Sequence, residues 1–159
     1  MDQPRDAAKV RFFPPGVPLL TMVIGYGLNR LMPLSDSYPL DAPTRYYIGG
    51  ALAVASVLVF GLWPVVMFRQ GGQSENPWKP TTHIEWRGPY KVSRNPMYLQ
   101  MILVCIGVSI AFANWWTLLL TPLAAWALFA VAIAPEEAYL EAKFGEPYLA
   151  YKRKVRRWI

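Results

Sequence analysis

The side chains that could carry out chemistry in this 159-residue chain gather in two short polar segments. One segment contains His83, Glu85 and Arg94, and the other contains the adjacent carboxylates Glu136 and Glu137. Imidazole and carboxylate groups transfer protons, and a guanidinium group binds anions. We therefore expect any ligand binding or reaction in these two segments.

Both segments also have a purely structural explanation. Gly88-Pro89 is typical of a turn, and Asn95-Pro96 suits the cap and first turn of a following helix. The two glutamates follow Pro135 and suit the first turn of a helix, where the helix dipole stabilises negative charge. These features are all typical of a polar loop with capped helices at a membrane surface, where Tyr90 and Tyr98 would be interfacial aromatics. It does not explain why so many titratable groups gather in the first segment.

Four apolar runs predict the elements that position these segments: residues 17–34, 46–68, 97–113 and 115–134. The second run has no charged residue and would form roughly 35 Å of helix, enough to cross a hydrocarbon core of about 30 Å. Only Asn114 separates the third and fourth runs, which predicts an antiparallel hairpin. Apolar residues make up 54% of the chain and charged residues 16%. We therefore predict a single all-α domain over residues 1–159, a polytopic membrane protein with four transmembrane helices.

The basic residues predict how these helices are oriented. Of the 16 lysines and arginines, only Arg30, near the end of the first run, and Arg45, just before the second run, would lie on the opposite side of the membrane. The others precede the first run (Arg5, Lys9 and Arg11), lie in the loop 69–96, or lie in the tail 135–159. By the positive-inside rule, the loop, the tail and both termini are cytoplasmic, in an inner or plasma membrane. The first run is interpreted as an uncleaved span.

Composition also excludes several kinds of partner. One cysteine and one histidine exclude a disulfide framework, a multi-thiolate metal site and a bis-histidine haem, so we expect no metal. The net charge of +6 follows from the orientation of the helices and from anionic lipid, so we expect no nucleic acid. The tail shows an apolar stripe of helical period interrupted by Gly145 and Pro147, which predicts two short amphipathic helices on the membrane. Its basic run 152–157 is interpreted as a lipid-facing anchor.

Two stretches of sequence together resemble a known superfamily. They are GPYKVSRNPMYL at residues 88–99 and, after the hairpin, EEAYLEAKFGEPYLAYKRKVRRWI at residues 136–159. In this order and separation they resemble the isoprenylcysteine carboxyl methyltransferase and phospholipid methyltransferase superfamily of small integral membrane enzymes. The resemblance covers about the last half of the chain. It implies a methyltransferase that uses S-adenosylmethionine, enclosed between the cytoplasmic loop and the C-terminal amphipathic helices, and a lipophilic or amphipathic acceptor that enters from the bilayer.

The resemblance also implies site residues. Arg94 and Glu137 would be catalytic. The cofactor-binding residues would be Thr82, His83, Ile84, Glu85, Tyr90, Asn95, Pro96, Met97, Tyr98, Glu136 and Glu137.

Each of these residue types suits a part of the cofactor. Either glutamate could hold the ribose hydroxyls or the methionyl ammonium, and Arg94 or the helix end at Asn95 could hold the carboxylate. Tyr90 or Tyr98 could face the sulfonium through a cation–π contact.

The acceptor stays open: an isoprenylcysteine-like carboxylate or a phospholipid amine is expected, and a small thiol or an isoprenoid lipid would also fit. An amine would need a base, for which His83, Glu85 and Glu137 are the candidates. Many members of the superfamily have histidine at the position of Asn95, and the prenylcysteine enzymes tend to place an arginine shortly before the glutamate pair, where this chain has none. The alternative is a non-catalytic four-span scaffold or assembly protein that retains the fold.

Overall fold

The computed structural model describes residues 7–10, 12–35, 37–74 and 76–159, and within these ranges it contains helices and loops but no strand. The α-helices are α1 (Gly16–Leu31), α2 (Ala42–Ser56), α3 (Trp63–Gln70), α4 (Pro96–Ala111), α5 (Trp115–Leu128), α6 (Ala134–Phe144) and α7 (Glu146–Lys154). The predicted all-α class is therefore confirmed. Arg5 and Arg11, which contribute to the predicted orientation, lie outside the described residues.

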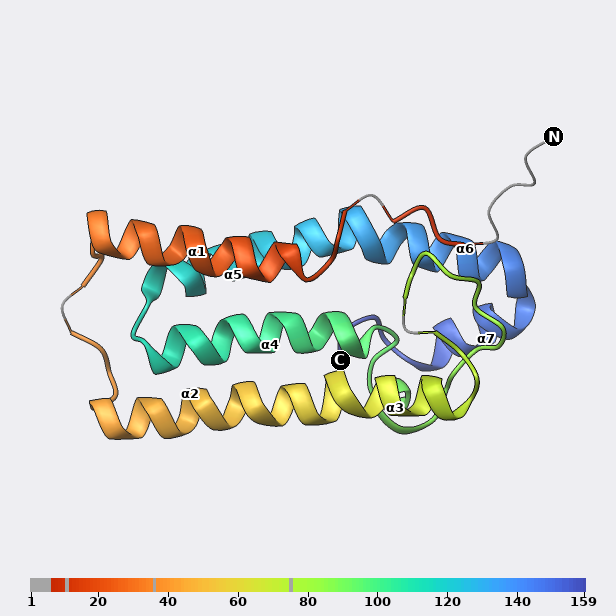
Figure 1. Cartoon of the computed structure of the whole chain (residues 1–159), viewed down its shortest axis with the longest axis horizontal. Helices are drawn as coiled ribbons and strands as arrows, with labels where there is room; N and C mark the ends of the chain where they lie inside the picture. The colour runs from red at the N-terminus through yellow and green to blue at the C-terminus, as the bar shows by residue number, and fades with distance from the viewer. Residues whose placement is uncertain (1–6, 11, 36, 75) are drawn as a thin grey trace.

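Two pairs of these helices join into longer rods (Figure 1). A π-helical segment, Val57–Leu62, connects α2 to α3, and another, Phe129–Ile133, connects α5 to α6. The rods Ala42–Gln70 and Trp115–Phe144 contain 29 and 30 residues and are long and apolar enough to cross a membrane. The helices α1 and α4 have 16 residues each, about 24 Å of helix.

A proline follows each π-helical segment and helps to explain it. Pro64 and Pro135 each lack the N–H that an α-helix would use and crowd the carbonyl four residues earlier. A widened turn absorbs both defects without ending the helix. As predicted, Pro135, Glu136 and Glu137 stand in the first turn of an α-helix, α6, but this helix is continuous with α5 through the π-helical segment, so that the rod runs from Trp115 to Phe144.

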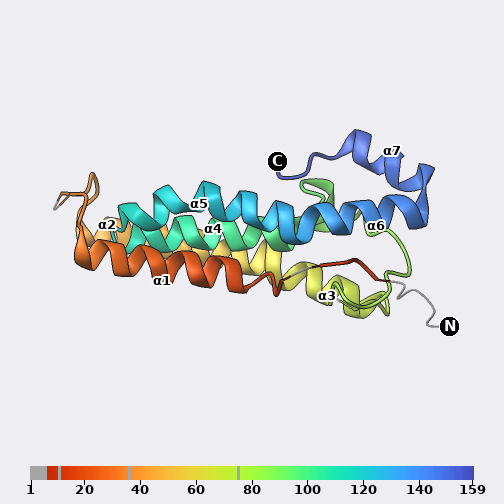
Figure 2. The same ribbon diagram turned by 90° about the horizontal axis from the view of Figure 1, so that it is seen from above.

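The helices of the bundle lie side by side along most of their length (Figure 2). Helix α2 lies against α4, α1 lies against α5, and α4 and α5 form the predicted hairpin. At the α2–α4 crossing, a Cβ atom on Gly49 would collide with the backbone of Gly107 and Ala111. The absence of side chains at this crossing lets the two backbones approach closely.

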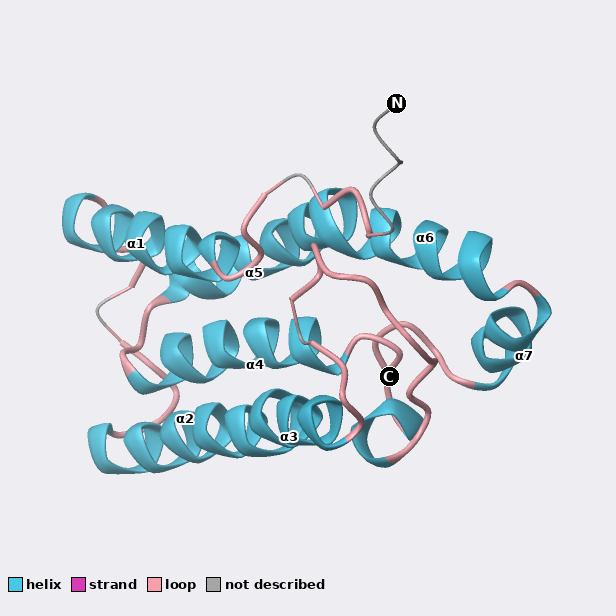
Figure 3. Ribbon diagram, turned by 45° about the vertical axis from the view of Figure 1, so that its right-hand side comes forward, coloured by secondary structure: helices cyan, strands magenta, loops and turns pink. Residues whose placement is uncertain are grey.

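The connections at one end of the bundle cover the ends of α4 and α6 (Figure 3). The loop between α3 and α4 and the short helix α7 lie at this end. The described N-terminal residues also run here, where Ala8 and Val10 are buried against Tyr98, Leu128 and Ile133. The indole N–H of Trp78 donates a hydrogen bond to the Val10 carbonyl (3.1 Å). Three segments far apart in the sequence are thereby held together.

Candidate functional site

A cavity of about 400 Å³ lies at this end of the bundle. Such a volume falls within the range of about 300–1,000 Å³ that is usual for small-molecule sites. Its walls come from the N-terminal segment (Phe13, Pro14 and Pro15), from α3 and the following loop (Phe68, Ser74, Asn76, Pro77, Trp78, Thr81, His83, Ile84, Glu85 and Tyr90), from the start of α4 (Arg94, Asn95, Pro96, Met97, Tyr98 and Met101), and from the C-terminal helices (Glu136, Leu140, Tyr148 and Tyr151).

The structure brings most of the residues predicted from sequence to this one cavity. His83, Ile84, Glu85, Tyr90, Arg94, Asn95, Pro96, Met97, Tyr98 and Glu136 all line it. Thr82 and Glu137 are not among the lining residues. The two glutamates that the sequence left interchangeable therefore have different surroundings.

Glu136 is the carboxylate of this pair that lines the cavity. Its Oε2 accepts a hydrogen bond from the hydroxyl of Tyr98 across 2.9 Å, which joins α6 to the first turn of α4. Tyr98 is itself buried, with 8% of its surface exposed. A carboxylate at the wall of an aromatic cavity can accept hydrogen bonds from hydroxyl or ammonium groups of a ligand.

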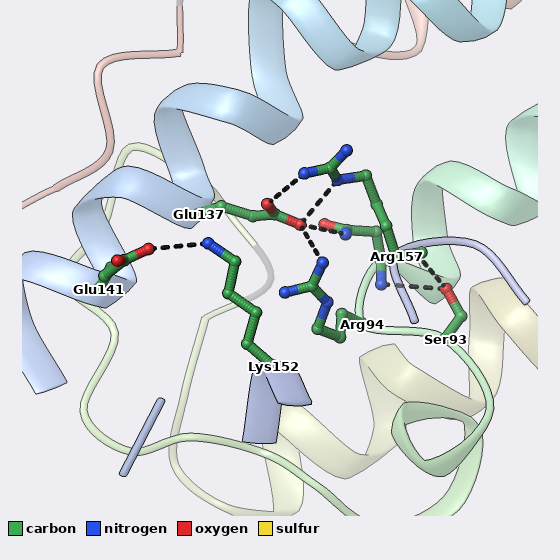
Figure 4. Close-up of polar contacts among 7 residues, drawn as sticks. Ser93, Arg94, Glu137, Glu141, Lys152 and Arg157 are labelled. Carbon is green, nitrogen blue, oxygen red and sulfur yellow. Dashed lines mark hydrogen bonds and ion pairs between the residues drawn. The ribbon is translucent and has the colours of Figure 1, made fainter. Parts of the chain in front are cut away.

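Glu137 faces the other way and is held by three side chains (Figure 4). The guanidinium of Arg157 donates two hydrogen bonds to it, from Nε to Oε1 (3.0 Å) and from Nη2 to Oε2 (2.9 Å). Arg94 Nη2 lies 3.3 Å from Glu137 Oε1 in an ion pair, and Asn95 Nδ2 donates to the same oxygen across 3.3 Å. Asn95 occupies the N-cap position of α4, as predicted, but its side chain caps no backbone N–H because it is directed to Glu137.

Arg94 connects this buried cluster to the cavity. Its side chain is only 7% exposed, and its backbone N–H donates to the carbonyl of Arg156 (3.0 Å). Among the described residues, its Nε and Nη1 have no hydrogen-bond acceptor. Unpaired buried donors of a guanidinium are costly, and an anionic ligand group in the adjoining cavity would satisfy them.

Glu85 has a partner of its own. Its Oε1 accepts hydrogen bonds from the backbone N–H groups of Trp86 and Arg87, and the Arg87 guanidinium donates to both carboxylate oxygens at 2.9 and 3.0 Å. The hydrogen bonds from the Arg87 side chain lower the pKa of Glu85 below its ordinary value, against the opposing effect of burial. The Glu85 carboxylate at the cavity wall is thus kept ionised.

Tyr90 forms an aromatic wall of the cavity. Its ring stacks on Phe68 with centroids 5.6 Å apart, and its carbonyl accepts a hydrogen bond from the Tyr151 hydroxyl (2.7 Å). Burial, and secondarily the nearby negative charge of Glu136, raises the pKa of Tyr90 well above its ordinary value. The phenol is therefore neutral at physiological pH, and Tyr90 contributes a neutral aromatic ring to the cavity wall.

The sequence did not indicate the contacts of two residues at this end of the bundle, Gln73 and Arg157. Buried Gln73 accepts hydrogen bonds from the backbone N–H groups of Thr82 and His83 (3.0 and 3.4 Å) and so shapes the loop. Arg157 belongs to the basic run that was interpreted as a lipid-facing anchor, yet it binds Glu137. Neither residue stands in a pattern that could have indicated these contacts.

The fold and the cavity describe a small helical protein with membrane-length apolar rods and a ligand-sized site at one end. Residues 44–147 match the family model described as phospholipid methyltransferase. The chain belongs to this methyltransferase family, as the two sequence motifs indicated.

Two curated relatives match parts of the chain. An uncharacterized protein of Haemophilus influenzae is 41% identical over 71 residues, which cover 40% of this chain and 100% of that protein. Protein-S-isoprenylcysteine O-methyltransferase of Schizosaccharomyces pombe is 35% identical over 68 residues, which cover 43% of this chain. The match spans only 29% of the length of the yeast enzyme. No solved structure matches the chain.

Proposed function

We propose that this protein is an S-adenosylmethionine-dependent membrane methyltransferase whose cofactor binds in the cavity between the loop 69–96 and the C-terminal helices. Membership of a methyltransferase family supports the reaction class. The observation that carries the proposal is the meeting of Arg94 and Tyr90, from the stretch 88–99, with Glu136, from α6, at the wall of one cavity. These are an anion-binding group, a carboxylate and an aromatic face, which match the three polar ends of this cofactor.

The residues present fit the cofactor in two respects. The unpaired Nε and Nη1 atoms of Arg94 suit its carboxylate. Glu136 suits either the ribose hydroxyls or the methionyl ammonium, with its other contact, to Tyr98, holding it in place. When bound, S-adenosylmethionine supplies a methyl group on a positively charged sulfur, ready for in-line displacement.

The chain itself then has two tasks, to align the acceptor and to exclude water. Tyr90, stacked on Phe68, presents a rigid and neutral ring that stabilises a nearby positive charge. Trp78 and Phe13, which stack with centroids 6.5 Å apart, line the cavity on the side of the N-terminal segment. We assign Glu137 to the positioning of Arg94, because its carboxylate is bound by two guanidinium groups and does not line the cavity.

The acceptor is proposed to be lipophilic or amphipathic, with either a carboxylate or an amine as its nucleophile. A carboxylate is already anionic, whereas an amine must first lose a proton. Of the three candidate bases, Glu85 and Glu137 are each held by a guanidinium group. His83 lines the cavity, and its Nδ1 lies 3.2 Å from the Thr82 hydroxyl. If the acceptor is an amine, we assign His83 as the base that takes its proton.

We further propose that four helical segments span the membrane, namely α1, the rod Ala42–Gln70, α4 and the rod from Trp115, with both termini cytoplasmic. The two long rods meet the length requirement, and α1 and α4 pack alongside them. This arrangement places the cavity at the cytoplasmic surface, where a soluble cofactor reaches it from water and the acceptor reaches it from lipid.

Calorimetric titration of the detergent-purified full chain with S-adenosylmethionine and S-adenosylhomocysteine tests the proposal. We expect micromolar binding of both, reduced at least tenfold in the Glu136→Gln variant and left unchanged in the Glu146→Gln variant, whose carboxylate lies on the surface. Absence of binding by folded parent protein would contradict the proposal and favour the scaffold alternative. Transfer of a labelled methyl group to lipid extracts then identifies the acceptor class.

A further inference from the structure

The last residues of the chain reach back to the proposed site. The hydroxyl of Ser93, which is completely buried, donates to the carbonyl of Arg157 across 2.9 Å, and the N–H of Arg94 donates to the carbonyl of Arg156. Ser93 also accepts a hydrogen bond from the N–H of Asn95 (3.1 Å). The tail is thus bound directly to Ser93 and Arg94, just before α4.

The side chain of Arg157 is fixed equally well. Its guanidinium carbon lies 4.7 Å from the centre of the Phe129 ring, and its two donors form a fork on the Glu137 carboxylate. Glu137 is only 7% exposed, whereas Arg157 is 34% exposed, so the tail covers the buried carboxylate from the solvent side. Planar, bidentate pairs of this kind define direction as well as distance.

The charges of the cluster explain why two arginines meet one glutamate. Arg94 and Glu137 alone would form a neutral buried pair, and Glu137 would compensate the charge that Arg94 offers to a ligand. With Arg157 present, the three groups carry one net positive charge. Because Arg157 neutralises Glu137, the positive charge of Arg94 is left for an anion in the cavity. The unpaired Nε and Nη1 atoms of Arg94 are the donors that would bind this anion.

We propose that Arg157 is a positioning residue of the methyl-transfer site, which through Glu137 orients Arg94 and preserves its charge for the carboxylate of the cofactor. The inference rests on the proposed function, since it concerns the same cavity. It assigns to the extreme C-terminus a role in ligand affinity in place of membrane anchoring. Arg157 itself does not line the cavity.

Two ligands that differ in one group separate this role from a general structural one. S-adenosylmethionine carries the carboxylate, whereas its decarboxylated form keeps the adenosine, the sulfonium and the ammonium. We expect Arg157→Ala to weaken calorimetric binding of S-adenosylmethionine by about tenfold or more and binding of the decarboxylated form by less than about twofold. The Arg157→Lys variant keeps the charge but not the two-pronged hydrogen bonding. Its affinity for S-adenosylmethionine should lie between that of the parent and that of Arg157→Ala.

Arg156→Ala is the matched control. It removes the same charge from the neighbouring position, its side chain is exposed, and the backbone carbonyl that binds Arg94 remains. Both ligands should bind this variant within about twofold of the parent. The inference would be overturned if Arg157→Ala bound S-adenosylmethionine as tightly as the parent does, or if its affinity for both ligands fell by the same factor. Either result would leave the proposed function standing. Failure of the parent to bind either ligand would overturn the proposed function together with the inference.

Discussion

The hydroxyl of Tyr98 donates a hydrogen bond to Glu136 Oε2 across 2.9 Å, and this contact joins the two sequence motifs of the chain. It holds one carboxylate at the cavity wall in a fixed direction. In the proposed site, Tyr98→Phe removes this restraint but keeps the carboxyl group, so we expect S-adenosylmethionine to bind about threefold to tenfold more weakly. Glu136→Gln should lower the affinity for S-adenosylmethionine more than Tyr98→Phe does in the same calorimetric titration. The reverse order would contradict the role of Glu136.

The close approach of α2 and α4 leads to a prediction on stability. Alanine at Gly49 would press its methyl group into the backbone of Gly107 and Ala111, so we expect the protein to lose about 1–3 kcal/mol of stability. The neighbouring Gly50 faces open space, and alanine there should be neutral or slightly stabilising because of its better helix propensity. Thermal unfolding in detergent, followed by circular dichroism, measures both. Equal midpoints for the two variants would refute the predicted crossing.

The N-terminal segment should control how quickly a ligand leaves. Trp78 donates to the Val10 carbonyl and stacks on Phe13, so Trp78→Ala releases this segment from the cavity. We expect dissociation of S-adenosylhomocysteine to become about threefold to thirtyfold faster in stopped-flow displacement. Trp86→Ala is the control, because the Trp86 side chain is 61% exposed and only its backbone N–H binds Glu85. An unchanged rate in Trp78→Ala would show that the segment does not cover the site.

The Glu85–Arg87 pair predicts a dependence on pH. The pKa of Glu85 is lowered from 4.5 in the folded protein, chiefly by the Arg87 side chain. The pair therefore stabilises the loop above pH 4.5, and this stabilisation is lost as the pH falls through the lowered pKa. Arg87→Ala removes the side-chain hydrogen bonds and the charge that lower the pKa of Glu85, while burial and the two backbone N–H donors remain. The pKa of the carboxyl should therefore rise relative to the parent, and cofactor binding should fail at a higher pH. Lys91→Ala is the control, because it removes an exposed positive charge from the same loop. In this variant, cofactor binding should be lost at the same low pH as in the parent.

Much of the site follows from sequence because its parts are local. The stretch 88–99 places a turn, an arginine and the first residues of α4 within one short segment, and the tail places its glutamate pair on one helix. Local segments of this kind keep their relative geometry in almost any tertiary arrangement. The sequence therefore determined the all-α class, the two motifs and the family, and most of the site residues that it predicted line the cavity.

The tertiary structure alone decided which glutamate faces the cavity. The π-helical segment Phe129–Ile133 adds a residue to one turn, and one extra residue rotates everything after it by about 100° around the helix axis. Glu136 and Glu137 stand side by side in the sequence, so their directions depend on this widened turn. Arg157 and Gln73 likewise gained their contacts with Glu137 and the 82–83 backbone only when the chain folded back on itself, because a hydrogen bond between distant segments leaves no spacing pattern in the sequence.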